Sequence, residues 1–205
     1  MRAPAPARLA PQAGFWLALI ASVGVALFSY RYLLPHAPAI PPNVLANRFT
    51  RYGVLTVHAG FAATALILGP WQFIARVRAS RPTIHRWIGR LYVTACLAGG
   101  TAGLVLAMGA STGWISSLGF GTLAILWMHA TARAWLAIRA RHVAEHRRWM
   151  IRSFTLTFAA VTLRLYLPLA MMLPVDGADS YRAISFLCWV PNLVLAEVYL
   201  ARRPG

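Results

Sequence analysis

Residues 14–34 read GFWLALIASVGVALFSYRYLL, and Arg31 is the one charged side chain in this stretch. A helix needs about 20 mostly apolar residues to cross the hydrocarbon core of a bilayer, so this stretch has the length and composition of a transmembrane helix. Five more apolar stretches follow, at about residues 52–75, 84–108, 114–138, 149–173 and 183–200. The sequence therefore predicts an all-α, polytopic membrane protein with a bundle of six transmembrane helices.

The overall composition excludes an ordinary soluble protein. Hydrophobic residues make up 59% of the 205-residue chain and charged residues 12%, and the mean hydropathy is +0.59. Soluble domains carry about 25% charged residues, because they need a polar surface around the core. We expect a single transmembrane domain over residues 14–200, with short cytoplasmic tails at residues 1–13 and 201–205.

The first apolar stretch has an alternative interpretation as a secretory signal. Ala37-Pro38-Ala39 loosely resembles a cleavage site. The apolar run is longer than the roughly 7–15 residues of a typical signal core, however, and Pro38 lies in the middle of the site. The sequence therefore favours an uncleaved first helix.

The distribution of the basic residues indicates how the chain is oriented in the membrane. The net charge is +16, the isoelectric point is near 11.6, and all 20 basic residues are arginine. In a soluble protein this charge would suggest nucleic-acid binding, but most of these arginines lie where apolar runs end. If the N-terminus is cytoplasmic, fifteen arginines lie on that side, and only four lie opposite: Arg31, Arg48, Arg51 and Arg182. The positive-inside rule then predicts cytoplasmic termini in a multi-pass protein of a bacterial inner membrane, with lipid and no nucleic acid as its partner.

Two ionisable side chains lie deep in the outer half of the predicted bundle. His58 lies roughly 9 Å below the outer end of the second helix, and Arg164 roughly 13 Å below that of the fifth. Charged groups inside a span are costly and are by default functional candidates. Because arginine does not lose its proton, Arg164 needs an acceptor: His58, Gln72, Asn192, a hydroxyl or carbonyl, or a bound anion or quinone oxygen. We expect it to face the bundle interior beside an outward-open cavity, with His58 on the wall.

Glu197 is the acidic residue closest to the cytoplasmic arginines within the bundle, near the inner end of the sixth helix. It completes the predicted ligand-binding set of His58, Gln72, Arg164, Asn192 and Glu197. The alternative for Glu197 is an ion pair with Arg90, Arg148 or Arg152. The two cysteines, Cys96 and Cys188, lie inside apolar runs without CxxC or zinc-site spacing, so no metal site is expected.

His85 and His146 begin look-alike segments, HRWIGR and HRRWMIR, at the cytoplasmic ends of the third and fifth helices. Imidazole is the usual axial ligand of haem iron. His58, His85, His129 and His146 follow one another on four consecutive helices, as in two-haem transmembrane cytochromes b. The depths of His58 and His129 differ by roughly 13 Å, which excludes an outer haem. One haem b between His85 and His146, or a quinone-like ligand, remains. The other histidines are predicted in loops: His36 and His142.

The same residues carry a resemblance to a family. They are His58, GPWQF at 69–73, His85-Arg86, Gly89-Arg90, Tyr92, His146, RWMIRSF at 148–154, Leu163-Arg164, CWVPN at 188–192 and Glu197. This series resembles the bacterial membrane-protein family called domain of unknown function 2306. The resemblance covers about residues 58–197, and the His-x-x-Trp-Met-x-Arg-Ser stretch is its most specific part. It implies a multi-pass membrane protein, without implying a reaction or a role for His129.

Three classes of function follow from these residues. The favoured hypothesis is an intramembrane ligand or redox site built from histidine and arginine, with a single b-type haem or a quinone-like ligand. The first alternative is a transport or permeation protein in which His58, Arg164 and Glu197 line a polar path. The second is a non-catalytic membrane subunit or assembly factor that buries these residues against each other, a second copy or a partner subunit. Whether the protein is an enzyme stays open, and a visible spectrum would discriminate best.

Overall fold

The computed structural model describes residues 9–34 and 42–202, and the regular elements within these residues are all helices. In chain order they are α1 (Leu9–Ser29), the 3-10 helix η1 (Tyr30–Leu33), α2 (Pro42–Trp71), α3 (Ala75–Ser80), α4 (Pro82–Ala107), α5 (Trp114–Arg139), α6 (Val143–Thr157), α7 (Ala159–Ala170), α8 (Gly177–Leu187) and α9 (Val190–Ala201). His36 lies outside the described residues.

Six helical stretches are long and apolar enough to cross a membrane. They are Ala13–Leu33, Arg51–Trp71, Pro82–Ala107, Trp114–Arg139, Val143–Ala170 and Gly177–Ala201. The fifth stretch comprises α6 and α7, which are separated at Phe158, and the sixth comprises α8 and α9, which are separated at Cys188 and Trp189. The predicted all-α fold with six transmembrane helices is confirmed.

Several helices begin before the predicted apolar runs. Helix α1 already begins at Leu9, inside the segment predicted as a tail, and α6 begins at Val143 rather than near Trp149. Helix α4 begins at Pro82, two residues before the predicted start. Hydropathy identifies only the part of a helix that lies in the hydrocarbon core. Proline in the first turn and acidic residues such as Glu145 favour a helix start outside that core, before the apolar run begins.

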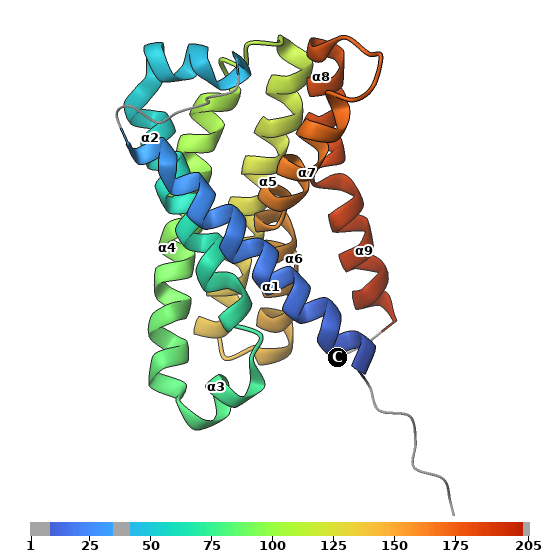
Figure 1. Cartoon of the computed structure of the whole chain (residues 1–205). Coiled ribbons are helices and arrows are strands. Elements are labelled where there is room, and N and C mark those ends of the chain that lie inside the picture. The colour runs from blue at the N-terminus through green and yellow to red at the C-terminus, as the bar shows by residue number, and fades with distance from the viewer. Residues whose placement is uncertain (1–8, 35–41, 203–205) are drawn as a thin grey trace, which may run out of the picture.

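Four helices, α2, α4, α5 and α6, form the centre of the bundle (Figure 1). Helix α4 packs against α2 and α5, and α6 packs against α5 and α2. Helix α1 runs obliquely across the bundle and contacts α2 and α7, while α8 packs against α5 and α9 against α6. Helix α3, the α5–α6 connection, the start of α1 and the end of α9 lie towards one end, which we name the α3 end (Figure 1). The opposite end is named the α8 end.

Small residues allow the helices to approach closely. A Cβ added at Gly99 of α4 would lie 3.2 Å from the backbone nitrogen of Ala62 in α2. A Cβ added at Gly119 of α5 would lie 2.8 Å from the Cβ of Ser185 in α8. Lipid tails are as apolar as leucine, so association in a membrane depends on such backbone proximity and on interhelical hydrogen bonds. These contacts bring polar side chains of different helices within reach of each other.

Candidate functional site

A cluster of hydrogen-bonded side chains occupies the centre of the bundle. This hydroxyl cluster consists of Tyr92 on α4, Trp127 and Thr131 on α5, and Ser153 and Thr157 on α6. The Tyr92 hydroxyl lies 2.9 Å from the hydroxyls of both Ser153 and Thr157. Thr131 Oγ1 lies 2.7 Å from Ser153 Oγ, and Trp127 Nε1 donates to Thr157 Oγ1 at 2.8 Å. All five side chains are buried, so the cluster joins three helices away from solvent.

The hydroxyl cluster leaves no polar atom without a partner. Besides the bonds between its side chains, Thr131 donates to the carbonyl of Trp127 at 2.8 Å. Thr157 donates to the carbonyl of Ser153 at 2.9 Å. A buried network in which every member is satisfied makes the packing unique. The cluster therefore has a structural role and calls for no ligand.

The two predicted haem-ligand histidines both lie at the α3 end, His85 on α4 and His146 on α6. His146 Nδ1 lies 2.8 Å from the carbonyl oxygen of Ala134 on α5. Because a carbonyl can only accept, Nδ1 carries the proton and Nε2 of the neutral ring keeps a free lone pair. His85 Nδ1 is buried and has no hydrogen-bond partner among the described residues. The two rings interact electrostatically, so α4 and α6 present both imidazoles to one region.

Gln72 adds a second incompletely bonded group to this region. It follows the last turn of α2, its side chain is 8% exposed, and Nε2 has no hydrogen-bond partner among the described residues. Its Oε1 would lie 3.2 Å from a Cβ added at Gly89, one turn beyond His85 on α4. Arg78 of α3 also interacts electrostatically with His85. We name the group of His85, His146 and Gln72 the histidine site.

Arg164 and His58 lie near each other at the α8 end, together with Arg31. His58 Nδ1 bonds the carbonyl of Gly99 at 2.9 Å, and its ring interacts electrostatically with Arg164. Arg164 Nη1 donates to the carbonyl of Ala160, one turn earlier on α7, at 3.0 Å. Arg164 also interacts electrostatically with Arg31 of η1. We name Arg31, His58 and Arg164 the arginine site.

The remaining predicted residues are bonded elsewhere. Asn192 donates to Thr162 Oγ1 at 3.1 Å and to the carbonyl of Cys188 at 3.0 Å. Glu197 accepts from Arg152 with both oxygens, at 2.6 and 2.8 Å, which is one of the ion pairs that the sequence offered as the alternative. His58 and Arg164 are therefore together, Gln72 belongs with the histidines, and Asn192 and Glu197 belong to neither group.

His129 lies apart from both groups. It is exposed on α5, and its ring meets Trp149 edge to face, with the two ring centroids 5.5 Å apart. This position gives His129 an aromatic contact on the bundle surface, and no contact with His58 is recorded among the described residues.

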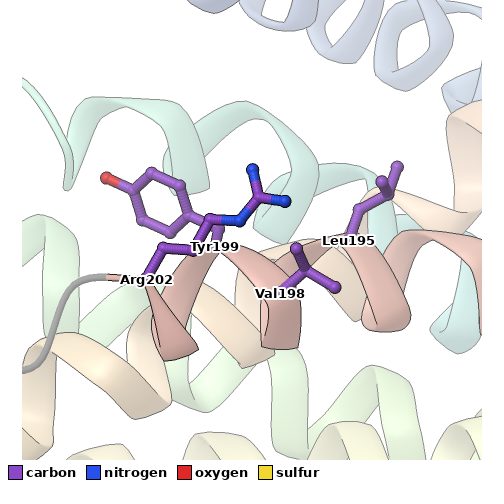
Figure 2. Close-up of a pocket in the computed structure, with 4 residues that line it drawn as sticks. All are labelled: Leu195, Val198, Tyr199 and Arg202. Carbon is purple, nitrogen blue, oxygen red and sulfur yellow. The ribbon is translucent and has the colours of Figure 1, made fainter.

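Two shallow pockets lie on the surface, and neither is lined by a histidine. One lies along a single face of α9 and is lined by Leu195, Val198, Tyr199 and Arg202 (Figure 2). The other lies over α2, α3 and α4 and is lined by Leu68, Trp71, Val77, Arg81, Ile84 and Ile88. Both are mostly apolar, as a surface that faces lipid should be, so neither is a better candidate than the two polar sites.

Sequence reasoning missed the hydroxyl cluster and the place of Arg31. Ser153 and Thr157 are four residues apart and so share one helix face, which was the available signal. Hydroxyls inside a span can bond the carbonyl one turn earlier, however, so the spacing does not require partners on other helices. Arg31 was counted with the arginines that flank the membrane, because it closes the first apolar run.

Comparison with known families agrees with the sequence. A family model described as "Predicted membrane protein (DUF2306)" matches residues 55–200. The match includes His58, His85, His146 and Arg164, and it confirms the resemblance deduced from the motifs. No curated protein and no solved structure matches the chain.

Proposed function

Since the chain belongs to the DUF2306 family of predicted membrane proteins, we propose that it is a multi-pass inner-membrane redox protein that holds one haem b between His85 and His146. The observation that carries this proposal is the pair of imidazoles at the α3 end. One ring is oriented by the Ala134 carbonyl, and the other has a buried nitrogen that bonds to none of the residues that the structure describes.

The donor set fits haem better than a structural metal ion. Zinc sites use three or four protein ligands, and no group of three or more His, Cys, Asp or Glu side chains gathers within residues 9–34 and 42–202. Haem iron needs only one or two axial protein ligands. A metal-binding histidine typically donates its other N–H to a carbonyl or carboxylate, and His146 already has such a bond to Ala134.

The chain would contribute orientation and charge at this site. The bond from His146 Nδ1 to Ala134 leaves Nε2 as the nitrogen that would ligate iron, and Gln72 Nε2 is a buried donor for an oxygen of the bound group. Arg78 supplies positive charge near His85, which favours a cofactor with carboxylate substituents. When bound, haem would supply one-electron redox chemistry.

The permeation alternative is less well supported than a redox site. A polar path along the bundle axis would have to pass the hydroxyl cluster, in which Tyr92, Thr131 and Ser153 have no exposed surface. Their hydrogen-bonding capacity is already used within the cluster. The non-catalytic subunit alternative differs from the redox proposal in one observable: its purified protein would be colourless.

A visible spectrum of the full-length protein in detergent tests the proposal, after expression with a haem precursor supplied. We expect a Soret band and a pyridine haemochrome typical of haem b. His85→Ala and His146→Ala should each abolish or strongly reduce this absorbance, because each removes an axial nitrogen. The matched controls are His129→Ala and His142→Ala, which remove exposed imidazoles and should keep the spectrum. A well-folded, colourless wild-type protein contradicts the proposal.

Orientation is the second part of the proposal: the α3 end faces the cytoplasm. Its support is the excess of arginine in the segments that lie there, and arginine in short loops resists translocation. Reporter fusions at Ala79 and Ala144 should behave as cytoplasmic, and fusions at Gly113 and Asp179 as periplasmic. The opposite result at two of these positions would reverse the assignment of the two sites to the membrane faces.

A further inference from the structure

We propose that Arg31, His58 and Arg164 form a second ligand site, which binds an oxyanion such as a phosphate or carboxylate group at the α8 end. This site lies away from the histidine site and does not depend on haem binding. The proposal rests on the charge balance of the chain, on unpaired donors at the site and on a histidine ring held in one orientation.

The charge balance leaves the two arginines without a counter-ion. The chain has four carboxylate side chains, and each of them is bonded elsewhere. Three form ion pairs, Glu145 with Arg133, Asp179 with Arg182, and Glu197 with Arg152. The fourth, Asp176, caps the first turn of α8.

The two guanidinium groups therefore have no carboxylate side chain beside them. The ionisable group next to both is the Tyr32 hydroxyl, which accepts from Arg31 Nη2 at 3.1 Å and interacts electrostatically with Arg164. Arg31 and Arg164 carry the same charge, and their electrostatic interaction is repulsive. Burial makes such a pair more unfavourable, since fewer water molecules screen it. A bound anion would be attracted by both groups and would reduce the repulsion between them.

Arg31 and Arg164 also have guanidinium N–H groups that make no hydrogen bond among the described residues. A guanidinium carries five N–H donors. Arg31 uses Nη2 to donate to the hydroxyl of Tyr32 at 3.1 Å, while its buried Nε has no partner among the described residues. Arg164 uses Nη1 for the Ala160 carbonyl. The unused N–H groups suit an oxyanion, because phosphate and carboxylate oxygens accept several such bonds.

The position of Arg31 is held by its neighbours. Its guanidinium carbon lies 3.7 Å from the centroid of the Phe28 ring, in cation–π contact. The hydroxyl of Tyr30 lies 2.9 Å from Thr64 Oγ1, which attaches η1 to α2. The site is thus preorganised by contacts among α1, η1 and α2.

His58 completes the site with a fixed ring. Because Nδ1 donates to the Gly99 carbonyl, Nε2 remains for a ligand, and it has no hydrogen-bond partner in residues 9–34 and 42–202. The ring packs against Gly103, where an added Cβ would lie 2.9 Å from Nδ1. A neutral Nε2 accepts from the hydroxyl of a protonated phosphate, and a protonated Nε2 donates to an oxygen. We assign His58 the role of orienting the anion that the arginines bind.

Two sources could supply this chemistry, a phospholipid headgroup or a free anion in the aqueous phase. Thermal unfolding of the full-length protein in detergent, with sodium phosphate against sodium chloride at constant ionic strength, tests for the free anion. Native mass spectrometry with added phosphatidylglycerol against phosphatidylcholine tests for the headgroup. We expect saturable stabilisation in the first case and selective retention of the anionic lipid in the second.

The variants Arg31→Gln and Arg164→Met should weaken either response at least about tenfold, since each removes a charge-assisted contact. The matched control is Arg182→Gln. Arg182 lies near the same end, but its charge is already paired with Asp179 and its Nε with the Thr112 carbonyl. If Arg164→Met does not fold, Arg31→Gln and His58→Gln decide the matter. Binding of neither phosphate nor phosphatidylglycerol by the wild type overturns the proposal, as does unchanged binding by the folded variants.

Discussion

The hydroxyl cluster at the centre of the bundle and the two polar sites near its ends differ in whether their buried atoms are satisfied. In the cluster, Tyr92 and Ser153 bond within the protein, and no donor remains over. Four buried side-chain atoms have no partner among the described residues: Gln72 Nε2, His85 Nδ1 and Arg31 Nε belong to the two sites near the ends, and Ser22 Oγ of α1 belongs to neither. The difference separates two uses of polar residues in a membrane: satisfied groups hold helices together, and unsatisfied groups indicate where something else binds.

The largest expected change in stability comes from a substitution in the hydroxyl cluster. Tyr92→Phe leaves the hydroxyls of Ser153 and Thr157 without their shared partner in a buried place, so it should lower the free energy of unfolding by about 1–3 kcal/mol. Haem content and phosphate binding should not change. Unfolding by denaturing detergent measures the stability. The control Tyr166→Phe removes a partly buried hydroxyl for which no hydrogen bond is recorded, and should change stability by less than about 0.5 kcal/mol.

The next comparison uses two side-chain amides. Gln72→Leu removes a buried amide whose Nε2 has no partner among the described residues, so the ligand-free protein should be as stable as the wild type or more stable by up to about 1 kcal/mol, while haem retention falls. Asn192→Leu breaks the bonds to Thr162 and the Cys188 carbonyl and should lower stability by about 1–2 kcal/mol, without loss of haem. Equal destabilisation by both substitutions would show that Gln72 is satisfied in the membrane and would weaken the contrast.

The smallest expected effect concerns the ion pair near the α3 end. Arg152 and Glu197 are 18% and 47% exposed, and ion pairs with such access to water contribute about 0–1 kcal/mol. Glu197→Gln should therefore lower the free energy of unfolding by less than about 1 kcal/mol and leave haem and phosphate binding intact. Loss of haem or phosphate binding in this variant would show that Glu197 belongs to a binding site, as the sequence predicts.

The fold was predictable because length and hydropathy govern it directly. Each of the six apolar runs must satisfy its backbone internally in lipid, which leaves the helix as the available form for such a run. The breaks at Phe158 and at Cys188–Trp189 were not predicted, since neither lowers the hydropathy of its span. They lie beside Thr162 and Asn192, whose side chains hydrogen-bond to each other and to the Cys188 carbonyl.

The sites were predictable only in part. The pairing of His85 with His146, and of His58 with Arg164, followed from depth, because both members of each pair lie at similar heights in the membrane. The separation of Gln72 and Asn192 from Arg164 could not be predicted from depth, because the rotation of each helix about its axis depends on packing. Arg31 lies near Arg164 because η1 follows α1 directly. Counting residues along the predicted helices does not predict this proximity.

The hydroxyl cluster shows how two helices are rotated about their axes. His85 and Tyr92 are seven residues apart on α4, and His146 and Ser153 are seven apart on α6. Seven residues make nearly two turns, a rise of about 10.5 Å, so each histidine lies almost directly below its partner on the same face. The hydroxyls of Tyr92 and Ser153 lie 2.9 Å apart, so the faces of α4 and α6 that meet in the hydroxyl cluster are the faces that carry the two imidazoles. A single residue inserted between His85 and Tyr92 would swing His85 through about 100° and separate the pair without altering either histidine.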